Sequence, residues 1–137
     1  MWYVYDNGGI SLEADYPYVA ISQMCTADWN GPVSVSAVHP VQSYSESQLV
    51  AAIAQNGPVA VTVDAESTAF RMYKSGVINS SECGTKLDHA ITAVGYGTDE
   101  ASGLDYYYVR NSWGAGWGDQ GYLKIARNGD GYGICGI

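Results

Sequence analysis

Positive charge is scarce in these 137 residues, and no Lys or Arg precedes Arg71. Six basic residues stand against 14 acidic ones, for a net charge of -8. Nucleic acids and anionic membrane surfaces bind clustered basic side chains, so this composition argues against both as partners. An acid-stable secreted or vesicular protein would show such an excess of acidic residues. The excess would also arise if the N-terminal half faced a basic partner, such as missing chain or a cationic substrate. Charge alone does not choose between the two.

Long apolar runs are also lacking, since no segment approaches the ~18 residues of a membrane span. Apolar residues nevertheless make up 47% of the chain, which is too many for long-range disorder. The length suits about one domain and is sufficient to bury a core. We therefore expect a folded domain without a membrane partner.

Cysteine is rare and odd in number, with Cys25, Cys83 and Cys135 as its three positions. If two of them pair, the third is a free thiol or has its partner outside the chain. Three single pairings are possible, and arithmetic alone does not rank them.

Periodicity places helices early and strands late. Leu49, Ala52 and Ile53 share one helical face, and Gly57-Pro58 ends the pattern, which predicts a helix over 46–55. Ser45 and Gln48 can form a capping box at its start.

Alternation predicts four strands of an antiparallel sheet or partial barrel, at 59–64, 89–96, 106–111 and 121–127. Smaller predicted elements are a helix tail over 1–6, a short strand over 33–38 and one helical turn around Phe70 and Tyr73. The order is typical of an α+β fold.

Only two histidines are available as general bases. His39 lies between Val38 and Pro40 with no acidic or thiol neighbour, which favours a surface or structural role. His89 follows Asp88 at the start of an apolar strand. The glycines at 114, 116 and 118 lack the G-x-G-x-x-G spacing and a following helix, so they do not predict a phosphate loop.

Several motifs together resemble the papain-like cysteine proteases, of the cathepsin and papain type. Leu87-Asp88-His89-Ala90 with Val94-Gly95-Tyr96-Gly97 resembles their histidine motif, and Val109-Arg110-Asn111-Ser112-Trp113-Gly114 resembles their asparagine motif. Further matches in the family's order are Asn7-Gly8-Gly9-Ile10, Asp15-Tyr16-Pro17-Tyr18, Gly57-Pro58-Val59, Tyr73-Lys74-Ser75-Gly76, Trp117-Gly118 and Gly121-Tyr122. The resemblance covers essentially the whole chain. It implies an α+β papain-like fold, in which 1–40 is a remnant of the helical domain and the crossover, and 41–137 is the mostly antiparallel β-rich domain.

The resemblance also implies a chemistry, peptide-bond hydrolysis by a Cys-His-Asn mechanism. In the family a cysteine thiolate attacks the peptide carbonyl, and a histidine holds it as an ion pair and then protonates the leaving amine. That histidine corresponds to His89, and Asn111 corresponds to the asparagine that orients its ring. Trp113 would cover their contact from water. The positions that match substrate-binding residues are Thr62, Leu87, Asp88, Ala90 and Trp117. Peptides or proteins are the implied substrates, and no cofactor or metal is implied.

One departure from the family concerns the nucleophile. Its local signature is C-G-[SA]-C-[WY], about 130–150 residues before the histidine, and these 137 residues do not contain it. Cys25 lies only 64 residues before His89 in a different context, and the oxyanion-hole glutamine is missing too. We therefore expect a chain that is inactive alone, from an intact cysteine endopeptidase whose N-terminal half is its partner.

The resemblance ranks the cysteine pairings. Cys83 and Cys135 match a family disulfide, and Cys25 matches a position whose partner lies in the missing N-terminal part. The bridge would close 52 residues and contribute about 3–4 kcal/mol in the chain-entropy model. A lysosomal, vacuolar or extracellular location follows, because disulfides persist there. Asn79-Ser80-Ser81 is a glycosylation sequon between predicted elements.

Two other readings remain at this point. A non-catalytic relative would keep the fold and serve as a binding or scaffold module. An unrelated acidic binding domain would have to match the ordered motifs by coincidence.

Overall fold

The structure is a computed structural model that describes residues 1–27, 31–127 and 131–137. Two compact units make up the chain, Met1–Pro40 and Val41–Ile137. Within the described ranges, no helix has the length and apolar character needed to cross a membrane.

The Met1–Pro40 unit has little regular structure. Helix α1 (Trp2–Asp6) confirms the predicted helix tail, and the Asn7 side chain closes it by donating to the Tyr3 carbonyl at 2.7 Å. The strand predicted over 33–38 is wrong, because only an isolated bridge between Ile10 and Val33 forms there. No side chain from 33 to 38 is buried, so no packed face stabilises a strand.

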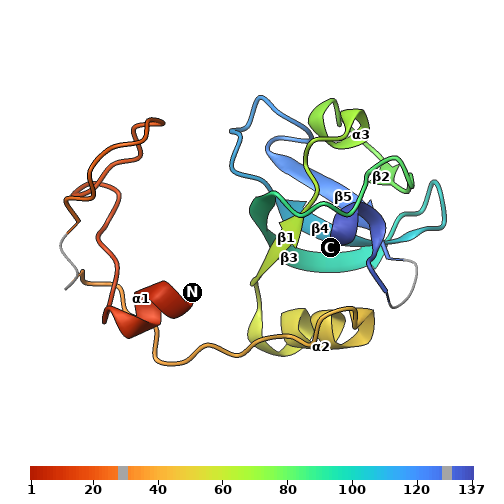
Figure 1. The fold of residues 1–137 in the computed structure, drawn as a ribbon. Coiled ribbons are helices and arrows are strands. Elements are labelled where there is room, and N and C mark those ends of the chain that lie inside the picture. The colour runs from red at the N-terminus through yellow and green to blue at the C-terminus, as the bar shows by residue number, and fades with distance from the viewer. Residues whose placement is uncertain (28–30, 128–130) are drawn as a thin grey trace. The chain divides into compact units, whose positions relative to one another are not determined.

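A five-stranded sheet dominates the Val41–Ile137 unit (Figure 1). Its strands are β1 (Val59–Val63), β2 (Val77–Ile78), β3 (His89–Thr98), β4 (Asp105–Arg110) and β5 (Tyr122–Ala126), in the order β1-β3-β4-β5-β2. The four predicted strands are confirmed as antiparallel neighbours. Strand β2 was not predicted, since two residues show no periodicity, and it pairs with β5 in parallel.

Helix α2 (Glu46–Asn56) packs on β1 and β3 and confirms the predicted helix (Figure 1). Leu49 and Ile53 are its buried residues, and Gly57 ends it with a φ of +84° that glycine adopts without strain. The predicted capping box is wrong. Gln48 instead binds the Gln42 side chain at 2.8 Å, and the Ser45 hydroxyl contacts that of Ser47 at 3.3 Å.

The core lies on one face of the sheet. Alternate residues of neighbouring strands point into it, as the period of two requires. Its most completely buried side chains, at 0–1% exposure, include Val63, Phe70, Ala93, Tyr107, Val109, Leu123 and Ile125. Phe70 comes from the short helix α3 (Thr68–Arg71), which confirms the predicted helical turn and begins where the Ser67 hydroxyl accepts the Phe70 N–H at 3.2 Å.

A disulfide joins Cys83 to Cys135, with Cα atoms 4.6 Å apart. Both residues are 1% exposed. Cys83 lies in the segment before β3, and Cys135 lies in the 3₁₀ helix η1 (Ile134–Gly136). The bridge therefore ties the entry of β3 to the C-terminal segment. Cys25, in the other unit, is exposed and not in a disulfide.

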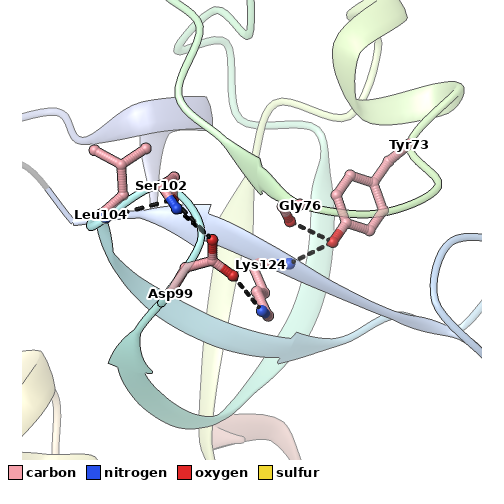
Figure 2. A network of polar contacts seen from close by, with 6 residues as sticks. All are labelled: Tyr73, Gly76, Asp99, Ser102, Leu104 and Lys124. Carbon is pink, nitrogen blue, oxygen red and sulfur yellow. Dashed lines mark hydrogen bonds and ion pairs between the residues drawn. The ribbon is translucent and has the colours of Figure 1, made fainter.

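A polar network joins the β3–β4 turn to β5 (Figure 2). The Asp99 carboxylate accepts from the Lys124 ammonium at 2.7 Å and from the Ser102 hydroxyl at 2.8 Å. The Lys124 backbone N–H donates to the Tyr73 hydroxyl, which itself donates to the Gly76 carbonyl at 2.7 Å. The network thus connects the turn, the middle of β5 and the segment that follows α3.

Asp99 should make this unit sensitive to acid. Hydrogen bonds from Lys124 and Ser102 lower the pKa of Asp99 from 3.8 to about 2. Because its folded-state pKa is depressed, the carboxylate stabilises the fold above its ordinary pKa, and this contribution is lost as the pH falls from about 4 to about 2. We expect Asp99→Asn to lower the unfolding temperature at pH 7. Near pH 2 the variant and the unsubstituted chain should unfold at the same temperature.

Thermal unfolding followed by circular dichroism across this pH range measures the effect. Glu100→Gln is the control, since it neutralises the exposed carboxylate next along the chain. An Asp99→Asn curve that runs parallel to the unsubstituted one at every pH would contradict the assignment.

Candidate active site

Strand register brings His89 and Asn111 to the same edge of the sheet. His89 is the first residue of β3 and lies opposite Val63 of β1. Asn111 directly follows β4, whose Arg110 pairs with Thr92 of β3. If that register continues by one residue, Asn111 lies opposite Ile91 and diagonally across from His89. Both side chains are then on the core-facing side of the sheet, close enough to touch.

The two side chains are hydrogen-bonded, with His89 Nε2 and Asn111 Oδ1 2.8 Å apart. The Ser112 backbone N–H also points to Asn111 Oδ1, at 2.7 Å. Because a backbone N–H only donates, it identifies this atom as the amide oxygen, so His89 Nε2 is the donor of the pair. The proton on Nε2 leaves Nδ1 as the nitrogen able to exchange a proton with another group.

Asn111 is held tightly by its surroundings. It is 7% exposed, and its backbone N–H donates to the Gly121 carbonyl at 2.9 Å. Its Nδ2 is one of two buried side-chain polar atoms without a hydrogen-bond partner among the described residues. The amide is thus oriented through its oxygen alone, by Ser112 and His89.

Four aromatic residues, Phe70, Tyr73, Trp113 and Trp117, form what we call the aromatic cluster. The Trp113 ring lies beside the His89 ring, with centroids 5.1 Å apart and planes at 31°. Phe70 stacks on Trp117 at 5.4 Å and meets Trp113 edge-on at 5.6 Å. The Trp117 indole N–H donates to the Arg71 carbonyl at 2.9 Å, which attaches the loop to α3.

Phe70 is a site residue that sequence reasoning missed. It is 0% exposed and meets the His89 ring edge-on at 6.4 Å, besides its contacts with Trp113 and Trp117. The pattern Phe70–Tyr73 indicated only a helical turn. No local signal links Phe70 to the histidine, because its partners Trp113 and Trp117 lie more than forty residues later in the sequence.

The residues expected to bind substrate lie in three places: on the paired strands β1 and β3, in the segment just before β3, and in the aromatic cluster. Thr62 and Ala90 are exposed and face each other directly across the β1–β3 ladder. Leu87, which is 52% exposed, lies just before β3. Asp88 accepts the Ala65 N–H through Oδ1 at 2.9 Å, so its carboxylate already binds the segment that follows β1. Trp117 belongs to the aromatic cluster.

A second carboxylate fastens the segment that carries Leu87. Asp64 is 9% exposed, and its Oδ2 accepts the Lys86 N–H at 2.9 Å. A Cβ at Gly84 would collide with this carboxylate, so any larger residue there would displace the Asp64 side chain. With the Cys83–Cys135 bridge, Asp64 and Asp88 hold the 83–88 segment against the end of β1.

The other two sequence candidates lie in the Met1–Pro40 unit. His39 is exposed, as expected for a surface role. Cys25 is exposed as well.

Known proteins share both the sequence and the fold of this chain. The model of the papain family cysteine proteases matches residues 1–137. Papaya proteinase 4 from Carica papaya is 47% identical over 98% of this chain. Cathepsin L from Sarcophaga peregrina is 45% identical over 92% of it. A bromelain protease structure from Ananas comosus, in complex with the E64 inhibitor, superposes with a TM-score of 0.85 and 40% identity over 99% of this chain.

The chain spans only part of each relative: 38% of papaya proteinase 4, 38% of the Sarcophaga cathepsin L and 62% of the bromelain chain. The match nevertheless includes the histidine and asparagine motifs and all five strands, because it covers the chain from end to end. The chain belongs to the papain family of cysteine proteases.

Proposed function

We propose that the protein containing this chain is a cysteine endopeptidase in which His89 is the general acid–base and Asn111 orients it. The observation that carries this proposal is the 2.8 Å contact between His89 Nε2 and Asn111 Oδ1, with the Ser112 N–H defining its polarity. An amide suits this role because it accepts the ring N–H without taking its proton. A buried Asn111 also keeps the imidazole in one tautomer.

In the proposed mechanism, His89 Nδ1 takes the proton of the nucleophilic thiol and holds the thiolate as an ion pair. The thiolate attacks the peptide carbonyl, and the protonated ring then gives its proton to the leaving amine. Trp113 lies beside the ring and keeps water from the His89–Asn111 bond, which strengthens it. Phe70 supports Trp113 from the core side.

The proposed substrates are peptides or proteins. Thr62 and Ala90 side by side, with Leu87 nearby in sequence, present a medium-sized and mostly apolar surface at the β1–β3 edge. Such a surface suits an apolar side chain of the substrate, two positions before the scissile bond. Binding of the E64 inhibitor by two structural neighbours supports a site of this type in the family.

We further propose that these 137 residues do not hydrolyse peptides by themselves, because the nucleophile and the oxyanion glutamine must come from another segment. The test compares the chain alone with the same chain preceded by a segment that carries the C-G-[SA]-C-[WY] signature. Both are assayed on a fluorogenic peptide amide with an apolar second residue. We expect turnover only from the longer chain, and we expect iodoacetamide to abolish it by alkylating the thiolate.

Two outcomes would contradict these statements. Robust turnover by the 137-residue chain, lost in His89→Ala, would show that a nucleophile exists within it. A longer chain that folds, forms the Cys83–Cys135 bridge and binds peptide without turnover would indicate a non-catalytic binding module.

The proposed location is the lysosome, the vacuole or the extracellular space. The relatives include cathepsin L and a digestive cysteine proteinase from Homarus americanus. A buried disulfide supports an oxidising compartment, because thiols are kept reduced in the cytosol.

A further inference from the structure

The chain contains one N-x-[ST] sequon, Asn79-Ser80-Ser81, which the catalytic proposal does not use. Asn79 directly follows β2, at the start of the segment that leads to Cys83. Asn79 and Ser81 are both exposed, and Ser80 is half-buried. The two side chains that a glycosyl transfer requires, the carboxamide and the hydroxyl two residues later, are therefore both at the surface.

The folded backbone also keeps Asn79 at a position where an attached glycan can remain in solvent. The Cys83 N–H donates to the Ser80 carbonyl at 3.1 Å, and the Glu82 N–H donates to the Ser80 hydroxyl at 3.2 Å. These bonds form a turn through the middle residue of the sequon. The folded chain thus holds Asn79 at the end of a strand and immediately before a turn, which is a surface loop position.

Asn79 also lies at a surface hollow of about 450 Å³ between α3 and β2. Met72 and Val77 line the same hollow, and Met72 is 68% exposed. The apolar face of a first sugar residue can cover a methionine side chain that the fold leaves in water. The hollow gives the modification room without displacing a packed side chain.

We propose that Asn79 carries an N-linked oligosaccharide, a statement that rests on the proposed lysosomal, vacuolar or extracellular location. The donor is a lipid-linked oligosaccharide pyrophosphate. The bond between sugar C1 and the pyrophosphate oxygen breaks, and its electron pair leaves with the pyrophosphate. A bond forms between C1 and Asn79 Nδ2, which gives up one proton, so no oxidant or reductant is required.

Sheet order places the attachment site and the histidine on different strands. Strand β2 is the edge strand next to β5, whereas His89 lies on β3 beside β1, the opposite edge strand. Strands β4 and β5 lie between β3 and β2. A glycan on Asn79 is therefore attached directly after β2, at the other edge of the sheet from β1, and not on β3, which carries His89.

The test is cell-free translation of the full 137-residue chain with endoplasmic reticulum microsomes. A cleavable signal sequence precedes the chain, and a C-terminal tag carries a reporter sequon that verifies translocation. Modification occurs during synthesis, so the result does not depend on how stably each variant folds. We expect two glycans on the unsubstituted chain, both removed by peptide N-glycosidase.

Substitutions within the sequon supply the matched controls. Ser81→Thr keeps the acceptor pattern and should carry two glycans, whereas Ser81→Ala and Asn79→Gln should carry only the reporter glycan. An unsubstituted chain that carries the reporter glycan alone would overturn the proposal. This result would leave the catalytic proposal intact, because peptide hydrolysis by the longer chain tests that separately.

Discussion

Replacing His89 with Ala in the longer, nucleophile-bearing chain is expected to lower kcat/KM by about 10⁴-fold. The substitution removes the group that we propose to ionise the thiol and to protonate the leaving amine. Both steps lose their proton carrier, and Asn111 Oδ1 loses the donor that now lies 2.8 Å away. Steady-state hydrolysis of a fluorogenic peptide measures the effect, with enzyme concentration taken from ultraviolet absorbance.

His39→Ala is the matched control, because it removes the chain's other imidazole from an exposed position. We expect it to leave kcat/KM within about twofold. The rate of iodoacetamide alkylation near pH 6 gives a second measurement, since loss of the His89 ion pair returns the thiol toward its ordinary, less reactive state. A His89→Ala loss below tenfold would be incompatible with the proposed role.

Phe70→Ala is expected to reduce the free energy of unfolding of the 137-residue chain by about 3–5 kcal/mol. The side chain is 0% exposed and is packed against the rings of Trp113 and Trp117. Its removal leaves a cavity where the core meets the site. Helix α3 has only four residues, and Phe70 is its buried one, so no other side chain of the helix can fill that cavity. Denaturant unfolding followed by far-ultraviolet circular dichroism measures the loss.

Phe70→Leu keeps most of the apolar volume and should cost less than Phe70→Ala. Tyr18→Ala removes an aromatic side chain that is 84% exposed, so we expect little change in stability. In Phe70→Ala, the near-ultraviolet signal of the tryptophans should also fall, because Trp113 and Trp117 lose their common neighbour. A stability change under 1 kcal/mol would show that Phe70 does not join the core to the site.

The regular part of the fold was largely predictable from sequence because buried and exposed residues alternate there. Val59, Val61 and Val63 specify β1, and Leu49 and Ile53 specify the buried face of α2. Where burial is absent the pattern misleads, as it did at 33–38. Pairing of β2 with β5 depends on a contact distant in sequence, which local periodicity does not contain.

The candidate site was reached through motifs rather than periodicity. His89 and Asn111 were identified by resemblance, and the structure brings them into contact, while their catalytic roles stay predictions. Phe70 and Asp64 were not identified, because their importance lies in what they touch after folding. The capping box failed for a related reason, since Gln42 competes for Gln48 from outside the helix.

The Cys83–Cys135 bridge closes a covalent ring of chain, and both His89 and Asn111 lie inside it. A single backbone cut within this ring, for example in the polar turn that carries Ser102, leaves both residues in one covalently connected molecule as long as the bridge is oxidised. A nicked form would therefore migrate as an intact chain without reductant and as two pieces with it. In a compartment rich in proteases, the ring allows one cleavage without separating the histidine from its asparagine.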